Sequence, residues 1–235
     1  VLNGSSLQSV GIGTIETLEV DNVNGVILTD NLEVSSTLTL SNGVVSTNGY
    51  DLKMKADTTT NGIIIDGLGV ISGDIVVEQF IPESGYGHHY LSTPMKNSLI
   101  SELNDDFPLN LNTSFPFLYH YDEPSYSWVS PSLYTDTMLL GKGYTAWVNG
   151  DRFFDIKGEA NSGDTPVNLT ASYDGWNFIG NPYPSAIDWD LVTVPGGVSA
   201  AVYVWNHNPI NCGNYTTYFD GLSINGGSNF IPMMQ

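Results

Sequence analysis

The chain has 235 residues, enough for one large or two ordinary domains with a sizeable buried core, and we predict two. Its 25 Asp and Glu residues against 6 Lys and Arg residues give a formal net charge of −19, which excludes nucleic acid and anionic membrane surfaces as expected partners. The single cysteine, Cys212, excludes an internal disulfide and a cysteine-based metal cage.

No apolar run approaches the roughly 20 residues of a membrane span, so direct membrane insertion is not expected. The sequence starts at Val1 rather than at Met, and we expect it to be a processed piece of a longer protein. The lack of a signal peptide therefore says nothing about secretion.

Residues 1–80 carry a repeat. After a strand expected at Ile15–Val20, Asn-Gly pairs recur at spacings of 18 and 19 residues, at Asn24-Gly25, Asn42-Gly43 and Asn61-Gly62. Between them lie short apolar-x-apolar strands, at Leu32-x-Val34, Leu38-x-Leu40, Leu52-x-Met54 and Ile75-x-Val77.

Such short strands are stable only when equivalent ones stack, so residues 13–80 are predicted to form a parallel β-helix or solenoid of about three to four rungs, with Asn-Gly at the corners. An antiparallel meander with chance Asn-Gly turns is the alternative. Because a solenoid exposes unpaired strand edges at its ends, neighbouring sequence or another chain should cover them.

The residue composition changes at Ile81-Pro82, after which aromatic residues become frequent. This change predicts a domain boundary near residue 80. The second domain, residues 81–235, is predicted to be an all-β, jelly-roll-like sandwich of two related halves, about 86–150 and 174–235. Residues 90–95 parallel 178–183 at an offset of 88 residues, and residues 117–122 parallel 201–206 at an offset of 84.

In this duplication, residues 139–148 should have a partner strand after Phe230–Gln235. We expect that last strand to be truncated here or supplied elsewhere. Residues 152–158 and 167–171 are predicted to pair as a hairpin with a long loop.

The most distinctive run, residues 175–189, combines an apolar strand, a Gly-Asn-Pro-Tyr-Pro corner and a short helical turn that Ser185 is expected to begin. It contains no nucleophile beside a base, which favours a structural corner over a catalytic loop. Its degenerate recurrence at residues 90–103 supports the same interpretation.

Four segments resemble a module of large secreted Bacteroidota proteins that typically precedes a C-terminal sorting domain of the type IX secretion system. These segments are His89-Tyr90-Leu91-Ser92-Thr93-Pro94, Gly141-Lys142-Gly143-Tyr144, Gly175-Trp176-Asn177-Phe178-Ile179-Gly180-Asn181-Pro182-Tyr183-Pro184 and Phe230-Ile231-Pro232-Met233-Met234-Gln235. The resemblance covers about residues 75–235 and implies an extracellular or outer cell-surface location. It implies no catalytic residues.

The histidines are weak candidates for metal ligands. His88 and His89 are adjacent and point to opposite faces of a regular strand. His120 and His207 lie in or beside the expected tyrosine-rich strands, where a packed histidine is the ordinary outcome.

Acidic pairs are candidates for a structural Ca²⁺ site, because calcium takes six to eight oxygen ligands. The pairs are Asp105 with Asp106 and Asp188 with Asp190. Solvated surface charge is the alternative for both pairs. No other cofactor is expected.

Aromatic residues are the strongest candidates for ligand binding, since sugar rings stack on aromatic faces. The candidate glycan-binding residues are Tyr121, Trp128, Trp205 and Tyr218, and packing within a sandwich is the alternative for each. Asp57-Thr58-Thr59 and Asp136-Thr137-Met138 resemble O-glycosylation sites of exported Bacteroidota proteins, which makes Thr58 and Thr137 candidate modification sites.

The expected function is that of a non-enzymatic, extracellular adhesin-type segment that holds neighbouring domains of a larger type IX-secreted protein. Its expected partners are those neighbouring domains, or the secretion and surface machinery. A carbohydrate-binding module attached to a secreted enzyme or adhesin is the alternative. An enzymatic function would require a catalytic domain outside this chain.

Overall fold

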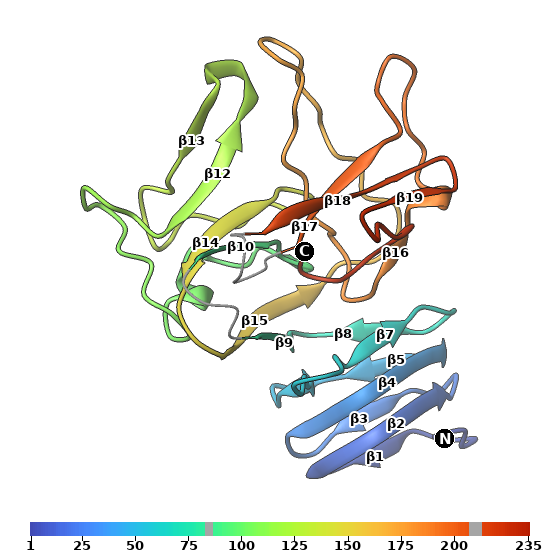
Figure 1. Cartoon of the computed structure of the whole chain (residues 1–235). Coiled ribbons are helices and arrows are strands. Elements are labelled where there is room, and N and C mark those ends of the chain that lie inside the picture. Colours follow the sequence, from blue (N-terminus) through green and yellow to red (C-terminus); the bar gives the residue numbers. More distant parts are fainter. Residues whose placement is uncertain (83–86, 207–212) are drawn as a thin grey trace.

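The computed structural model describes residues 1–82, 87–206 and 213–235. His207 and Cys212 lie outside the described residues. The chain is nearly all β, with a stack of parallel strands at one end and antiparallel sheets at the other (Figure 1). Within the described residues, no helix is both long and apolar enough to cross a membrane.

The N-terminal part is a parallel β-solenoid of about four turns, as predicted. All strand pairs within it are parallel. One sheet contains β1 (Gln8–Val10), β3 (Val26–Leu28), β5 (Val44–Ser46) and β8 (Val70–Ser72). The other contains β2 (Gly13–Asp21), β4 (Leu32–Asn42), β6 (Leu52–Met54), β7 (Ile63–Ile65) and β9 (Ile75–Ile81).

The predicted apolar pairs form continuous columns inside the solenoid. Val34 pairs with Met54, and Met54 pairs with Val77 in the next turn. All three side chains are fully buried. No single rung has enough apolar surface to bury these residues, so stacking supplies the core.

Two of the three predicted Asn-Gly corners are correct, and the third is wrong. Gly25 and Gly43 have φ values of +84° and +87°, which only glycine adopts readily. Gly62 does not have a positive φ and instead precedes β7 in the other sheet. A loop inserted between β6 and β7 lengthens this turn, and the corner that follows Gly43 in the stack is at Gly69, just before β8.

The C-terminal part is built from antiparallel sheets. Its four-stranded sheet has the order β10-β14-β12-β13, with β10 at Gly87–Leu91, β12 at Leu118–Asp122, β13 at Ser127–Val129 and β14 at Tyr144–Val148. A three-stranded sheet contains β17 (Val202–Asn206), β18 (Asn214–Phe219) and β19 (Leu222–Ile224), and β16 (Ile187–Asp188) pairs with β20 (Phe230–Ile231). The predicted all-β fold class, with a short parallel solenoid followed by further sheets, is confirmed.

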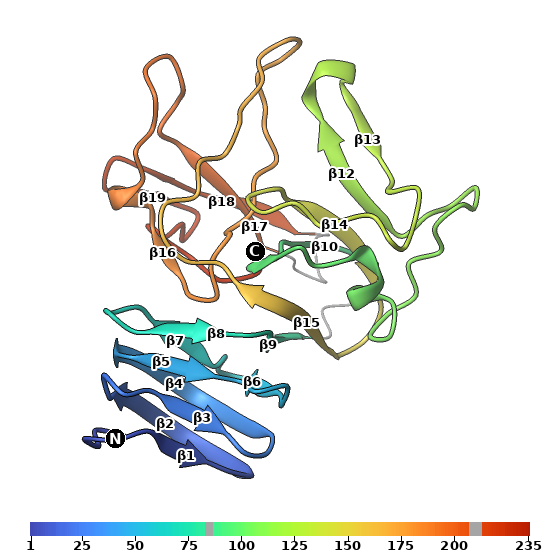
Figure 2. The same ribbon diagram turned by 180° about the vertical axis from the view of Figure 1, so that it is seen from behind.

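Strand β15 (Arg152–Ala160) joins the two parts, as Figure 2 shows from behind. It pairs antiparallel with β9 along seven residues and with β11 (Met95–Lys96) on its other edge. The resulting sheet, β11-β15-β9-β6-β4-β2, runs from the solenoid into the C-terminal part. The chain therefore covers the C-terminal edge of this solenoid sheet with its own sequence, as the fold requires.

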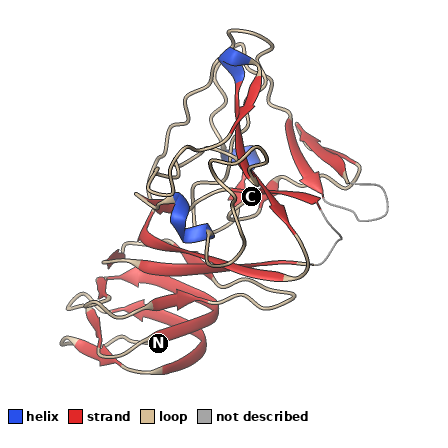
Figure 3. Ribbon diagram, turned by 90° about the vertical axis from the view of Figure 1, so that its left-hand side faces the viewer, coloured by secondary structure: helices blue, strands red, loops and turns tan. Residues whose placement is uncertain are grey.

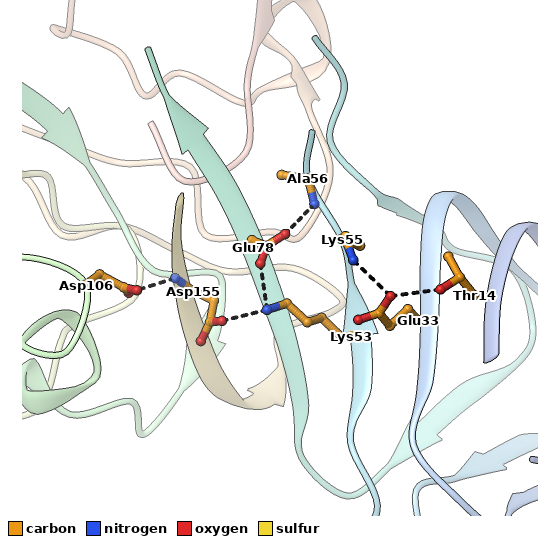
Figure 4. A network of polar contacts seen from close by, with 8 residues as sticks. All are labelled: Thr14, Glu33, Lys53, Lys55, Ala56, Glu78, Asp106 and Asp155. Carbon is orange, nitrogen blue, oxygen red and sulfur yellow. Dashed lines mark hydrogen bonds and ion pairs between the residues drawn. The ribbon is translucent and has the colours of Figure 1, made fainter. Parts of the chain in front are cut away.

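Ion pairs reinforce this junction (Figure 4). The Nζ of Lys53 on β6 lies 2.6 Å from a carboxylate oxygen of Glu78 on β9 and 2.9 Å from one of Asp155 on β15. Although burial favours the neutral amine, these hydrogen bonds raise the pKa of Lys53. One lysine thus links three neighbouring strands of the shared sheet.

The hairpin predicted from residues 152–158 and 167–171 is wrong. Residues 152–158 do form part of β15, but residues 167–171 form no strand. Residues 152–158 pair instead with β9, and β11 pairs with residues 159 and 160.

The helices are the 3-10 helices η1 (Ile100–Leu103), η2 (Glu123–Ser125) and η3 (Trp189–Leu191), and the last of these is the helical turn predicted within residues 175–189 (Figure 3). The predicted start of this turn at Ser185 is wrong. Ile187 and Asp188 pair with β20 instead, and the Asp188 side chain caps the helix by accepting from the Asp190 amide. The turn therefore begins only after this pairing.

Candidate functional site

A groove of about 1700 Å³ opens in the C-terminal part. One wall is the distinctive run from Gly175 to Tyr183, and the opposite wall is the stretch from Ala201 to Trp205, which includes most of β17. Loops at residues 164–169 and 191–199 contribute further lining. Figures 1 and 2 show these loops and the β12–β13 hairpin rising from the side opposite the solenoid.

Every residue of both walls lines the groove, from Gly175 to Tyr183 and from Ala201 to Trp205. Successive side chains of a strand point to opposite faces of its sheet, so a groove lying on one face would be lined by alternate residues. The lining is continuous along both segments, so backbone atoms as well as side chains border the groove.

Three of the four predicted ligand-binding aromatics lie together in this groove, namely Tyr121, Trp128 and Trp205. The rings of Tyr121 and Trp128 are 5.5 Å apart. Sequence reasoning missed Trp176, which is 57% exposed and contacts Tyr203 edge-on at 5.1 Å. Its flanking Asp174 and Asn177, also in the groove lining, were the available signal for a polar-edged aromatic site.

Tyr218, the fourth predicted aromatic, is placed elsewhere. Its side chain is buried, and its hydroxyl donates to the carboxylate of Asp190 at 2.8 Å. Because β18 alternates, Tyr218 faces the protein, and it does not line the groove.

The candidate calcium ligands Asp188 and Asp190 hold the second half together. Asn229 donates to Asp188 at 2.9 Å, and Asp190 accepts from the Tyr218 hydroxyl. Within the described part of the chain, no group of three or more His, Cys, Asp or Glu residues is arranged to hold a metal ion.

The other acidic pair lies beside the junction. The carboxylate of Asp106 accepts from the Asp155 amide at 3.0 Å, and burial raises the pKa of Asp106 to about 6. Asp105 is exposed. Asp106 therefore contacts the backbone of β15.

Glu123 fixes a loop at the rim of the groove. Its buried carboxylate accepts backbone hydrogen bonds from Ser172, Tyr173 and Gly175 at 2.8, 2.5 and 3.1 Å. Burial opposes ionisation, but these donors lower the pKa of Glu123 to about 2. The charged carboxylate thus holds the loop that precedes Trp176.

Two of the histidines pack within the four-stranded sheet. His88 is an exposed residue of β10, lies 5.2 Å from the Trp147 ring and shares a hydrogen bond of 3.2 Å with Thr145. Burial lowers the pKa of both His88 and His120, so neutral imidazoles are favoured at pH 7.

Both candidate modification sites are accessible. Thr58 is exposed in the loop between β6 and β7, where the Asp57 carboxylate accepts hydrogen bonds from Thr59 and Thr60. Thr137 is exposed beside an isolated bridge to Leu99.

Comparisons of this chain with protein-family models, curated proteins and solved structures find no significant match in any of the three.

Proposed function

We propose that this chain is a non-enzymatic structural segment of an extracellular or cell-surface protein. The continuous sheet that runs from the solenoid through β15 into the antiparallel domain supports this proposal. A continuous hydrogen-bonded sheet transmits force and orientation, as a spacer between neighbouring domains must.

The chemistry of the acidic residues agrees with a structural role. Of the carboxylates with shifted pKa values, Glu123 fixes the loop around Gly175, and Asp106 accepts from the β15 backbone. The net charge of −19 keeps such a surface soluble and repels anionic membranes. The resemblance of residues 175–184 to a type IX-secreted module supports the proposed location.

Surface labelling tests this proposal. An antibody raised against the chain should label intact cells of the source organism or their secreted fraction, while an antibody against a cytosolic protein stays negative. Labelling that requires cell lysis would contradict an extracellular role.

A carbohydrate-binding function is the second candidate, and the exposed aromatic groove favours it. Trp128 and Trp176 are 48% and 57% exposed, and Asp174 and Asn177 lie beside them. Flat aromatic faces with polar neighbours bind sugar rings by stacking and edge hydrogen bonds.

Glycan-array binding tests the second candidate. Binding should disappear in Trp128→Ala, Trp205→Ala and Trp176→Ala, and Trp176 is exposed enough for its substitution to spare the fold. Phe115→Ala removes an aromatic that is 78% exposed and does not line the groove, so it should bind normally. If the unsubstituted chain bound no glycan on a broad array, this candidate would be ruled out.

A further inference from the structure

The two halves of the C-terminal part contact each other through reciprocal hydrogen bonds. The Ser92 amide donates to the Met234 carbonyl at 3.1 Å, and the Gly180 amide donates to the Gly141 carbonyl, also at 3.1 Å. Ser92 and Gly180 are related by the repeat offset of 88 residues. Gly141 and Met234 also correspond, and both have positive φ, at +72° and +56°.

A second matched pair confirms this correspondence. The Ile100 amide donates to the Asp136 carbonyl at 2.8 Å, and the Trp189 amide donates to the Asn229 carbonyl at 2.7 Å. Each donor is the first residue of its 3-10 helix. The offset is 93 residues both from Asp136 to Asn229 and from Gly141 to Met234, so the two acceptor segments keep one register. The donors Ile100 and Trp189 are 89 residues apart, one more than Ser92 and Gly180.

One strand breaks this correspondence. In the first half, β14 lies between β10 and β12 and is antiparallel to both. The repeat offsets make residues 175–179 the counterpart of β10, and they make β17 the counterpart of β12. Among the described residues, β17 pairs only with β18, so no counterpart of β14 is present.

The groove occupies the place of that strand. Its two walls are the counterparts of β10 and β12, and β17 pairs on one edge only among the described residues. Gln235 lines the groove. The Gln235 side chain donates to the Trp205 carbonyl at 3.2 Å, and the Gln235 backbone carbonyl accepts from the Asn181 amide at 2.7 Å. Gln235 corresponds to Lys142, so a residue joined to it would take the place of Gly143, where β14 is about to begin.

We propose that the groove binds an extended β-strand that continues from Gln235, antiparallel to both walls, and completes the second half as β14 completes the first. The groove would bind this strand by adding it to free strand edges. Backbone hydrogen bonds would provide the affinity, and alternate side chains would provide the selectivity.

The groove also defines the side-chain pattern of this strand. In β14, the alternate residues Tyr144, Ala146 and Val148 are buried against the core. The groove is lined mainly by apolar and aromatic residues and contains no Lys or Arg. An alternating apolar strand fits it, and a strand rich in acidic residues would meet Asp164 and Asp174 without a compensating cation.

The test extends the chain after Gln235 by a copy of its own residues 143–148, Gly-Tyr-Thr-Ala-Trp-Val. The control extension replaces the threonine and the tryptophan by proline, which removes backbone donors and blocks strand pairing. The copied strand should raise the melting temperature by about 4 °C or more over the control. It should also slow amide exchange at residues 202–206 by at least about tenfold.

Equal melting temperatures and equal exchange at residues 202–206 for the two extensions would overturn the proposal. If the same six residues bound as a free peptide while the joined copy had no effect, the claim that the strand enters the groove as a continuation of Gln235 would be wrong. The joined strand and a glycan need the same groove, so the extended chain should lose any glycan binding that the original chain shows. None of these results affects the surface-labelling experiment. This proposal can therefore be refuted while the proposed function still stands.

Discussion

Two neighbouring phenylalanines on β15 provide a matched test of the junction between the solenoid and the antiparallel domain. Phe154 is 1% exposed and packs near Phe107, with ring centroids 6.2 Å apart. Phe153 points to the opposite face, is 43% exposed and contacts Phe80 at 4.8 Å. Both substitutions to alanine lose the same strand propensity, so they differ only in burial.

Phe154→Ala removes a fully buried ring and leaves a cavity, which costs about 4 kcal/mol of the free energy of unfolding. Phe153→Ala loses only the buried part of its ring and creates no enclosed cavity, which costs about 1 kcal/mol. Urea denaturation, followed by tryptophan fluorescence and by far-UV circular dichroism, measures both losses. Equal losses for the two variants would refute the assignment of Phe154 to a core shared across the junction.

Three further substitutions test local features. Burial raises the pKa of Asp106 from 3.8 to about 6, so its folded-state charge costs stability above pH 6 and this cost disappears as the pH falls toward 4. Asp106→Asn keeps an acceptor for the β15 amide. It should stabilise the protein at pH 7 by about 1 kcal/mol after solvent screening, with little gain at pH 4. Equal gains at both pH values, measured by urea denaturation, would contradict the burial of the charge as the cause. At the solenoid corners, Gly49→Ala should cost about 1 kcal/mol because φ is +86° with free space around it. Gly43→Ala should cost at least about 3 kcal/mol, because its Cβ would lie 1.8 Å from the Asn22 carbonyl oxygen, and thermal unfolding that ranks the two variants equally would disprove that clash.

The solenoid could be predicted because its signal is local and repeated. Alternating pairs such as Leu52-x-Met54 bury both apolar side chains wherever rungs stack, and Gly25 and Gly43 mark corners that require positive φ. The third corner could not be predicted from Asn61-Gly62, because an inserted loop shifted this pair to the other sheet. An Asn-Gly pair specifies a turn but not its place in a rung.

The partners of β15 were beyond sequence reasoning, since pairing with β9 depends on contacts between residues about 75 positions apart. For the candidate site, aromatic character singled out Tyr121, Trp128 and Trp205, which line the groove, and it singled out Tyr218 as well, whose side chain is buried. Trp176 was missed because it was assigned to the apolar strand predicted at the start of residues 175–189. In the structure this side chain is 57% exposed.

Two-probe unfolding tests the central claim that the solenoid and the antiparallel domain form one structural unit. All five tryptophans lie at Trp128 or beyond, so their fluorescence reports on the antiparallel domain alone. Amide exchange of residues 13–81, read by mass spectrometry across the same urea series, reports on the solenoid. A single shared midpoint is the predicted result, and two separate midpoints would contradict the claim.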